Sequence, residues 1–363
     1  MGFQQIRNYI PVFYHRFLPP FFDKEIPAEA FASCKTCPMT AKSRGEMESE
    51  TSGPFAPETK CCTFVPRVPN YFAGAVFSDP ETMIGRDLLK KRISLQRGIF
   101  PQGIYPDKKY RLLYEFGRKH GFGRSSLLKC PYYLQGEFNC SLWKYRESIC
   151  ATWFCKYLGG EAGKAFWDEM RDLFKLVQEK LTEHAIRELG LSVIPPFGED
   201  EQLTYEDLEE LPMHPEEYRQ RWQHWEGREE EFYTRCYEII NKLEVSSFNR
   251  LLGEEYTDQL KATEEKYHNM ILIPDQLQLN PDYPFEEVVP GRYRICLKSC
   301  IDRNETVITY AFDLPFPVIV GFRDGKSTEQ VLKKLSREYD IQLGKEVIIA
   351  LYHHGILISG PTG

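Results

Sequence analysis

The sequence predicts an α+β fold in which helices predominate. Three observations support this prediction: cysteines concentrate before residue 156, apolar residues recur at helical spacing through 162–189, and short β-branched and aromatic runs follow residue 280. We expect a mainly helical cysteine-rich domain at 1–160, a helical extension at 161–270 and a small α+β domain at 275–363. A chain of 363 residues is long enough for several hydrophobic cores.

The composition argues against some classes of protein. The formal net charge is −7, so the chain is not built to coat nucleic acid. The stretch MGFQQIRNYIPVFYHRFLPP has no uninterrupted apolar core, and no run approaches the roughly 18–20 apolar residues of a membrane span. We therefore expect a cytoplasmic protein without membrane association, in which thiols stay reduced.

The cysteines are the main functional signal. Eleven are present, and in a reduced compartment such a number points to metal rather than to disulfides. Eight form a C-x-x-C pair, an adjacent doublet and a block of four, and these are the predicted metal ligands: Cys34, Cys37, Cys61, Cys62, Cys130, Cys140, Cys150 and Cys155. Adjacent side chains of an extended segment point to opposite faces, so the doublet need not share one ligand role. Cys236, Cys296 and Cys300 are scattered, and we expect them to be dispensable for metal binding.

Thiolates as the only ligands suit zinc or an iron–sulfur cluster. Eight thiols suffice for two tetrahedral zinc sites, for two clusters, or for one site with spare thiols. Aromatic residues interleaved with the block would exclude water, which is one way to tune a cluster's potential, although they could equally be plain core. They are Tyr132, Tyr133, Phe138, Trp143, Tyr145, Trp153 and Phe154. The sequence favours iron–sulfur and leaves zinc open.

The pattern C-P-Y-Y-(x)6-C-S-L-W-(x)2-R-(x)3-C-(x)2-W-F-C, with the upstream C-x-x-C and doublet, resembles YkgJ-type cysteine-cluster proteins. The resemblance covers roughly residues 30–160 and implies a zinc- or iron-chelating domain. Some relatives, such as flagellin lysine methylases, suggest an iron–sulfur cluster. One departure is the polar insertion of 23 residues between Cys37 and Cys61, which leaves open whether these two pairs meet.

Charge is unevenly distributed. Residues 86–129 carry twelve Lys and Arg against three acids, whereas residues 199–231 carry thirteen Asp and Glu against three Arg. Cations near a thiolate centre would stabilise it, and they could also bind an anionic ligand. The simpler interpretation is a solvated face or a partner for the acidic stretch, and we prefer it.

The remaining segments follow local rules. We expect helices at 70–77 and 81–93, at 162–189 with Gly190 as its end, and through most of 203–265. Strands are expected at 293–300, 306–312 and 315–322. A capping box at Ser327 and Gln330 starts the first of two further helices, and 355–358 is expected to be a final strand.

The last 75 residues or so, with DGKSTEQVLKKL and the final HHGILI, resemble PqqD-like winged-helix domains. The resemblance implies a module that holds a peptide by strand addition, so we expect a peptide or protein partner at the C-terminal domain. The alternative is a plain interaction domain. DNA binding is unlikely because acids offset the bases of these helices.

Two classes of function remain. The first is an iron–sulfur protein that acts as a redox or peptide- or protein-modifying centre, with a C-terminal recognition domain. The second is a structural zinc-binding adaptor without catalysis. No phosphate-binding loop, zinc-protease motif or nucleophile elbow is present, so no catalytic residue is assigned and enzymatic activity stays open.

Overall fold

The computed structural model describes most of the chain. It covers residues 2–29, 55–136, 139–155, 157–197, 202–209, 211–300, 307–323 and 327–360, with the backbone alone at 296–300 and 307–312. Three residues of the predicted site, Cys34, Cys37 and Phe138, lie outside the described residues.

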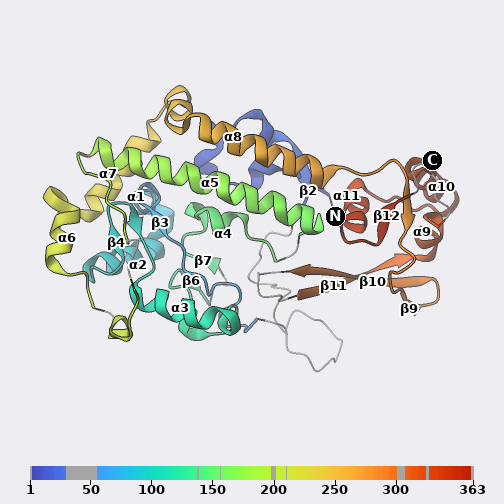
Figure 1. The fold of residues 1–363 in the computed structure, drawn as a ribbon, viewed down its shortest axis with the longest axis horizontal. Helices are drawn as coiled ribbons and strands as arrows, with labels where there is room; N and C mark the ends of the chain where they lie inside the picture. Colours follow the sequence, from blue (N-terminus) through green and yellow to red (C-terminus); the bar gives the residue numbers. More distant parts are fainter. Residues whose placement is uncertain are drawn as a thin grey trace.

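Helices dominate the structure before residue 272, and the two longest, α5 and α8, lie side by side (Figure 1). Every predicted helix in this region is present, and the prediction of an α+β fold dominated by helices is compatible with the structure. α5 buries Phe166, Met170 and Val177 along one stripe, as the apolar spacing indicated. Outside the cysteine-bearing segments, the helices of this region are α1 (Asn70–Ser78), α2 (Met83–Ser94), α5 (Gly160–Glu188), α6 (Pro215–Trp222), α7 (Glu229–Asn241) and α8 (Val245–Ile271).

α1 and α7 pack unusually closely because α1 carries Gly74 at the contact. A Cβ atom at this position would collide with the backbone carbonyl of Tyr233 on α7. The absence of a side chain therefore sets the distance between these two helices.

The N-terminal segment 2–29 belongs to the same core as the long helices. Its ends form a small antiparallel pair, β1 (Phe3–Gln5) with β2 (Glu25–Pro27), joined by three short 3₁₀ helices. The ring of Phe17 stacks on that of Phe248 in α8 with centroids 4.3 Å apart. A single cluster of buried side chains thus extends from Ile6 to Met270.

The cysteine-bearing segments lie below α5 in Figure 1 and have little regular structure. A three-stranded sheet of order β3–β5–β4 and a short hairpin, β6–β7, hold them together with two helices. The elements are β3 (Val68–Pro69), β4 (Ile99–Phe100), β5 (Gly103–Ile104), α3 (Lys108–Gly121), β6 (Tyr133–Leu134), β7 (Asn139–Cys140) and α4 (Ser148–Thr152).

Residues after 276 form a second core with a three-stranded antiparallel sheet of order β11–β10–β9. Arg292 of β10 pairs with Pro315 of β11, and β12 pairs with β8. The elements are β8 (Leu277–Leu279), β9 (Glu286–Val289), β10 (Arg292–Cys300), β11 (Val307–Pro315), α9 (Phe316–Gly321), α10 (Thr328–Tyr339), α11 (Lys345–His353) and β12 (Leu357–Ser359).

The strand predicted at 315–322 is wrong, because this segment is the helix α9. Pro317 lies in the first turn of α9, where its missing N–H costs no helical hydrogen bond, whereas it would break the ladder inside a sheet. Val318 and Ile319 are buried by the helix. Ser327 is the N-cap of α10, as the predicted capping box requires, since the backbone N–H of Gln330 donates to Oγ of Ser327 at 3.3 Å.

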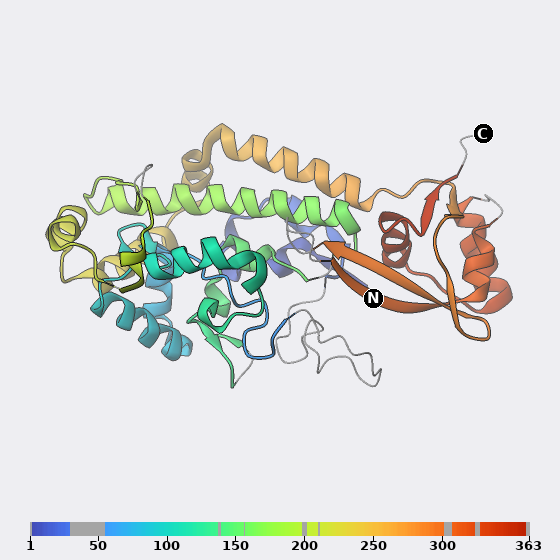
Figure 2. The same ribbon diagram turned by 60° about the horizontal axis from the view of Figure 1, so that its bottom comes forward.

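The second core contacts the first at the beginning of α5. The β10–β11 hairpin extends toward this end of α5 (Figures 1 and 2), and α11 contacts both α5 and α8. Nε2 of His353 lies 2.8 Å from the carbonyl oxygen of Met270, and Nε2 of His354 lies 3.2 Å from that of Tyr157. None of the helices in the described part of the chain combines the length and apolar character that a bilayer crossing requires.

Candidate metal centre

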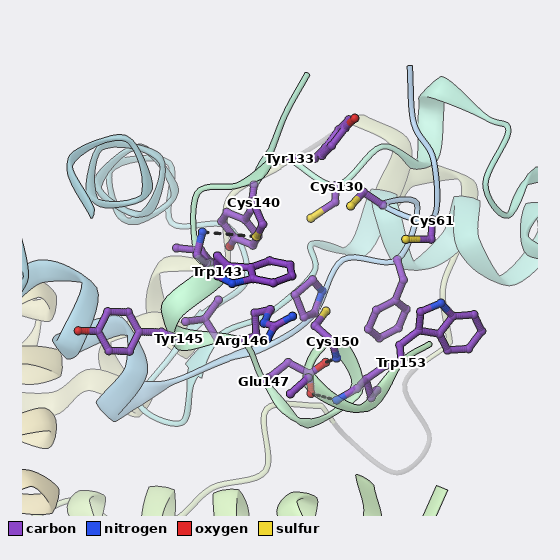
Figure 3. A pocket seen from close by; sticks show the side chains of 18 of the residues that line it. Cys61, Cys130, Tyr133, Cys140, Trp143, Tyr145, Arg146, Glu147, Cys150 and Trp153 are labelled. Carbon is purple, nitrogen blue, oxygen red and sulfur yellow. Dashed lines mark hydrogen bonds between the residues drawn. The ribbon is translucent and has the colours of Figure 1, made fainter. Parts of the chain in front are cut away.

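Five of the predicted ligands line one cavity of about 130 Å³: Cys61, Cys62, Cys130, Cys140 and Cys150. We call it the cysteine cavity. In Figure 3 the sulfur atoms of Cys61, Cys130, Cys140 and Cys150 are directed toward the space between them. The sixth described candidate, Cys155, packs with Cys61 around Phe55 and is hydrogen-bonded to Cys61. These six thiols come from four separate parts of the fold.

A turn brings both thiols of the doublet to the cavity, although an extended segment would have separated them. Lys60 has a left-handed φ of 51°, and the N–H of Cys62 bonds back to the carbonyl of Thr59 at 3.1 Å. The turn is fixed to the end of α3, because Thr59 donates to the carbonyl of Gly123 at 2.9 Å. The expectation of separate roles rested on extended backbone, which this segment does not have.

The β6–β7 hairpin positions Cys130 and Cys140. The N–H of Cys130 donates to the carbonyl of Cys62 at 2.8 Å, which joins the hairpin to the doublet. Cys140 pairs with Tyr133 across the hairpin, and its sulfur accepts a hydrogen bond from the N–H of Leu142 at 3.4 Å.

Cys150 lies on α4, whose N-cap is Glu147. The Glu147 carboxyl accepts hydrogen bonds from the N–H groups of Ile149 at 3.0 Å and Cys150 at 3.2 Å, and it also lines the cavity. Only 4% of this residue is exposed, and burial raises the pKa of its carboxyl. Sequence reasoning did not find Glu147, because glutamate is not among the preferred N-cap residues.

The thiols differ in acidity. Burial raises the pKa of Cys130 and of Cys150, and the neighbouring charge of Glu147 raises that of Cys150 further. Hydrogen bonds from Cys155 and Cys62 hold the pKa of Cys61 well below its usual range. Of these three thiols, Cys61 is the one most ready to bind a metal, while Cys130 and Cys150 would have to release protons on binding.

Aromatic side chains form most of the remaining wall. Of the seven aromatic residues expected around the block, all except Phe138, which lies outside the described residues, line the cavity. The guanidinium of Arg146 lies 3.6 Å from the centre of the Trp143 ring. Nε1 of Trp153 is buried without a hydrogen-bond partner among the described atoms. The cavity is thus mainly apolar, and its charged lining residues are Glu147, Arg67 and Arg146.

The other cysteines are placed differently. Cys236 is fully buried in α7 and does not line the cavity. Cys296 and Cys300 lie on β10, where the structure describes the backbone only.

The thiols surround the cavity without converging on one point. Within the residues that the structure describes, no three Cys, His, Asp or Glu side chains are arranged as ligands of a single metal ion. The donor set fits a soft metal by chemistry, because it consists of thiolates.

In comparisons of this chain with protein-family models, with curated proteins and with solved structures, nothing matched. The two resemblances seen in the sequence therefore remain expectations.

Proposed function

We propose that the protein holds an iron–sulfur cluster in the cysteine cavity through thiolates drawn from Cys61, Cys62, Cys130, Cys140, Cys150 and Cys155, with Cys34 and Cys37 as further candidates. The observation that carries this proposal is that five cysteines, from segments far apart in sequence, line one small apolar cavity. Free buried thiols are merely small hydrophobes, and packing alone gives no reason to collect five of them.

Two features favour a redox or modifying centre over a structural zinc site. The first is the aromatic wall, which would keep water from the centre, and low water access is one of the factors that set a cluster's potential. Arg67 and Arg146 line the same cavity and would balance the negative charge of several thiolates.

The C-terminal unit, residues 275–363, is proposed as the recognition domain of this centre. His354, directly after α11, contacts the carbonyl oxygen of Tyr157, two residues beyond Cys155, so a bound partner would lie near the cysteine-bearing segments. In the described part of the sheet, β11 pairs with β10 alone, which leaves its other edge open to an extended peptide.

Metal analysis of anaerobically purified protein tests the cluster. We expect brown protein that contains iron and acid-labile sulfide, and Cys130→Ser and Cys150→Ser should each lower the bound iron and the melting temperature, because metal binding contributes folding energy. Cys236→Ser is the matched control: it changes a buried thiol outside the cavity and should keep the full iron content.

Two results would contradict the proposal. Colourless protein with stoichiometric zinc would establish the structural zinc adaptor instead. Unchanged iron and sulfide after serine replacement of Cys61, Cys130, Cys140 and Cys150 together would place the metal elsewhere.

A further inference from the structure

A second hollow, of about 600 Å³, lies directly beside the cysteine cavity, between α3 and α5. We call it the basic cleft. The two hollows share part of their walls, namely Phe64, Arg67, Glu147 and Ile149. A molecule in the basic cleft would therefore lie next to the thiols.

Cations from three parts of the chain line the basic cleft. Arg111 and Arg118 lie seven residues apart on α3, which places them on one face of that helix. Arg171 and Lys175 come from one face of α5 in the same way. With Arg67 these make five cations against three carboxyl groups, Glu115, Glu147 and Asp172.

Ion pairs neutralise only part of the positive charge of the basic cleft. Arg171 is neutralised by Asp168 at 2.7 Å and Asp172 at 3.2 Å. Arg118 and Lys175, in contrast, have no ion pair with any carboxylate in the described ranges. The preference for a face paired with the acidic stretch holds elsewhere, since Lys90 pairs with Glu230 at 3.2 Å.

Arg67 lies in the wall between the two hollows and has unused hydrogen-bonding capacity. Its nearest carboxylate oxygen, on Glu179, is 3.9 Å from Nη1, Tyr105 is a hydrogen-bonding neighbour of the guanidinium, and Nη2 is buried without a partner of good geometry among the described atoms. A guanidinium has five N–H donors, so one acceptor leaves capacity for an anion.

We propose that the basic cleft binds a small anionic molecule through a carboxylate or phosphate group held by Arg67, Arg111 and Arg118. Guanidinium groups suit both anions, because their planar forks match pairs of oxygen atoms. The side chain of Arg111 also stacks on Phe197, whose ring centre lies 3.7 Å from the guanidinium carbon. This inference rests on the proposed function in one respect: the anion is the substrate class of the metal centre only if the cysteine cavity holds one.

Calorimetric titration of the full-length protein with inorganic phosphate and, separately, with citrate tests the proposal at constant ionic strength. We expect saturable binding at one site, and the tighter anion identifies the preferred group. Arg118→Gln should weaken binding about tenfold, as expected for a lost charge-assisted contact. Arg67→Lys should weaken it as well, because it keeps the charge and removes the fork.

Lys119→Gln is the matched control, since it removes one positive charge from an exposed position next to Arg118 that does not line the cleft. Equal weakening in Arg118→Gln and Lys119→Gln, or no saturable binding of either anion, would overturn the proposal. Iron measured on the same samples separates the two ideas: anion binding without iron contradicts only the cluster, and iron without anion binding contradicts only the cleft.

Discussion

The carboxyl group of Glu29 is one of the least expected features at the scale of single residues. It is 3% exposed, and its Oε2 accepts a hydrogen bond from the N–H of Leu158 at 3.1 Å. Burial raises the pKa of Glu29 to about 8. The folded protein therefore holds a proton on this group at neutral pH, whereas the unfolded chain does not.

Glu29→Gln should remove part of the pH dependence of stability. Between about pH 5 and 8 the folded state binds one more proton than the unfolded state, so the free energy of unfolding falls as pH rises through this window. We expect the neutral glutamine to raise that free energy at pH 8, relative to wild type, by on the order of 3 kcal/mol.

Urea denaturation at pH 5.5 and pH 8 measures this difference, with the exposed Glu265→Gln as control. If wild type and Glu29→Gln lose the same stability between the two pH values, Glu29 is ionised in the folded state.

At the scale of elements, the contact between α1 and α7 depends on Gly74. Gly74→Ala should lower the free energy of unfolding by about 1–3 kcal/mol or more, because its methyl group would collide with the carbonyl of Tyr233 and force the helices apart.

Gly117→Ala is the matched control for this substitution. Gly117 lies inside α3, where an added Cβ would have its nearest neighbour at 3.8 Å, so alanine should stabilise the helix by up to about 1 kcal/mol. Thermal unfolding of both variants decides the matter. A neutral Gly74→Ala would mean that the two helices separate at no cost.

The elements also mark what the sequence could and could not predict. Periodicity found α5 and the other long helices because their apolar stripes are long and regular. The strand predicted at 315–322 was wrong because a short apolar segment has no reliable periodicity. Tertiary packing decides that this segment is a helix.

The candidate site shows the same division. The cysteines could be predicted as candidates from their residue type and spacing, and the structure brings five of them to the cysteine cavity. The sequence did not predict that Arg67 and Glu147 belong to the site. Their roles depend on burial and on neighbours distant in sequence, and no local pattern indicates either. The Cys61 and Cys62 side chains both reach the cavity because of a left-handed turn at Lys60. The sequence did not indicate this turn, because the left-handed residue is not a glycine.

At the scale of the whole molecule, two cores meet through two adjacent histidines, His353 and His354. Burial lowers the pKa of His353, so the docked state prefers the neutral ring. A group of this kind favours docking above its ordinary pKa near 6.5, and the contribution is lost as pH falls below that value.

Acidification from pH 7.5 to pH 5.5 should therefore loosen the contact between α11 and the end of α8, and small-angle scattering should record a larger radius of gyration. His353→Gln should reduce this response, because glutamine can still donate to the carbonyl of Met270 and does not titrate. The exposed His120→Gln is the control. A radius independent of pH in wild type would show that the docking does not depend on this histidine.

The N-terminal segment has a consequence for how the chain reaches its fold. Tyr267 donates a hydrogen bond to the carbonyl of Glu25 across 242 positions of sequence, so the segment's final partner emerges from the ribosome long after the segment itself. At synthesis rates of roughly 5–20 residues per second, its aromatic side chains would wait on the order of 10–50 seconds for α8. During that interval they form an exposed hydrophobic surface on the nascent chain, to which a chaperone could bind. Assembly of the first core thus cannot finish until α8 has left the exit tunnel.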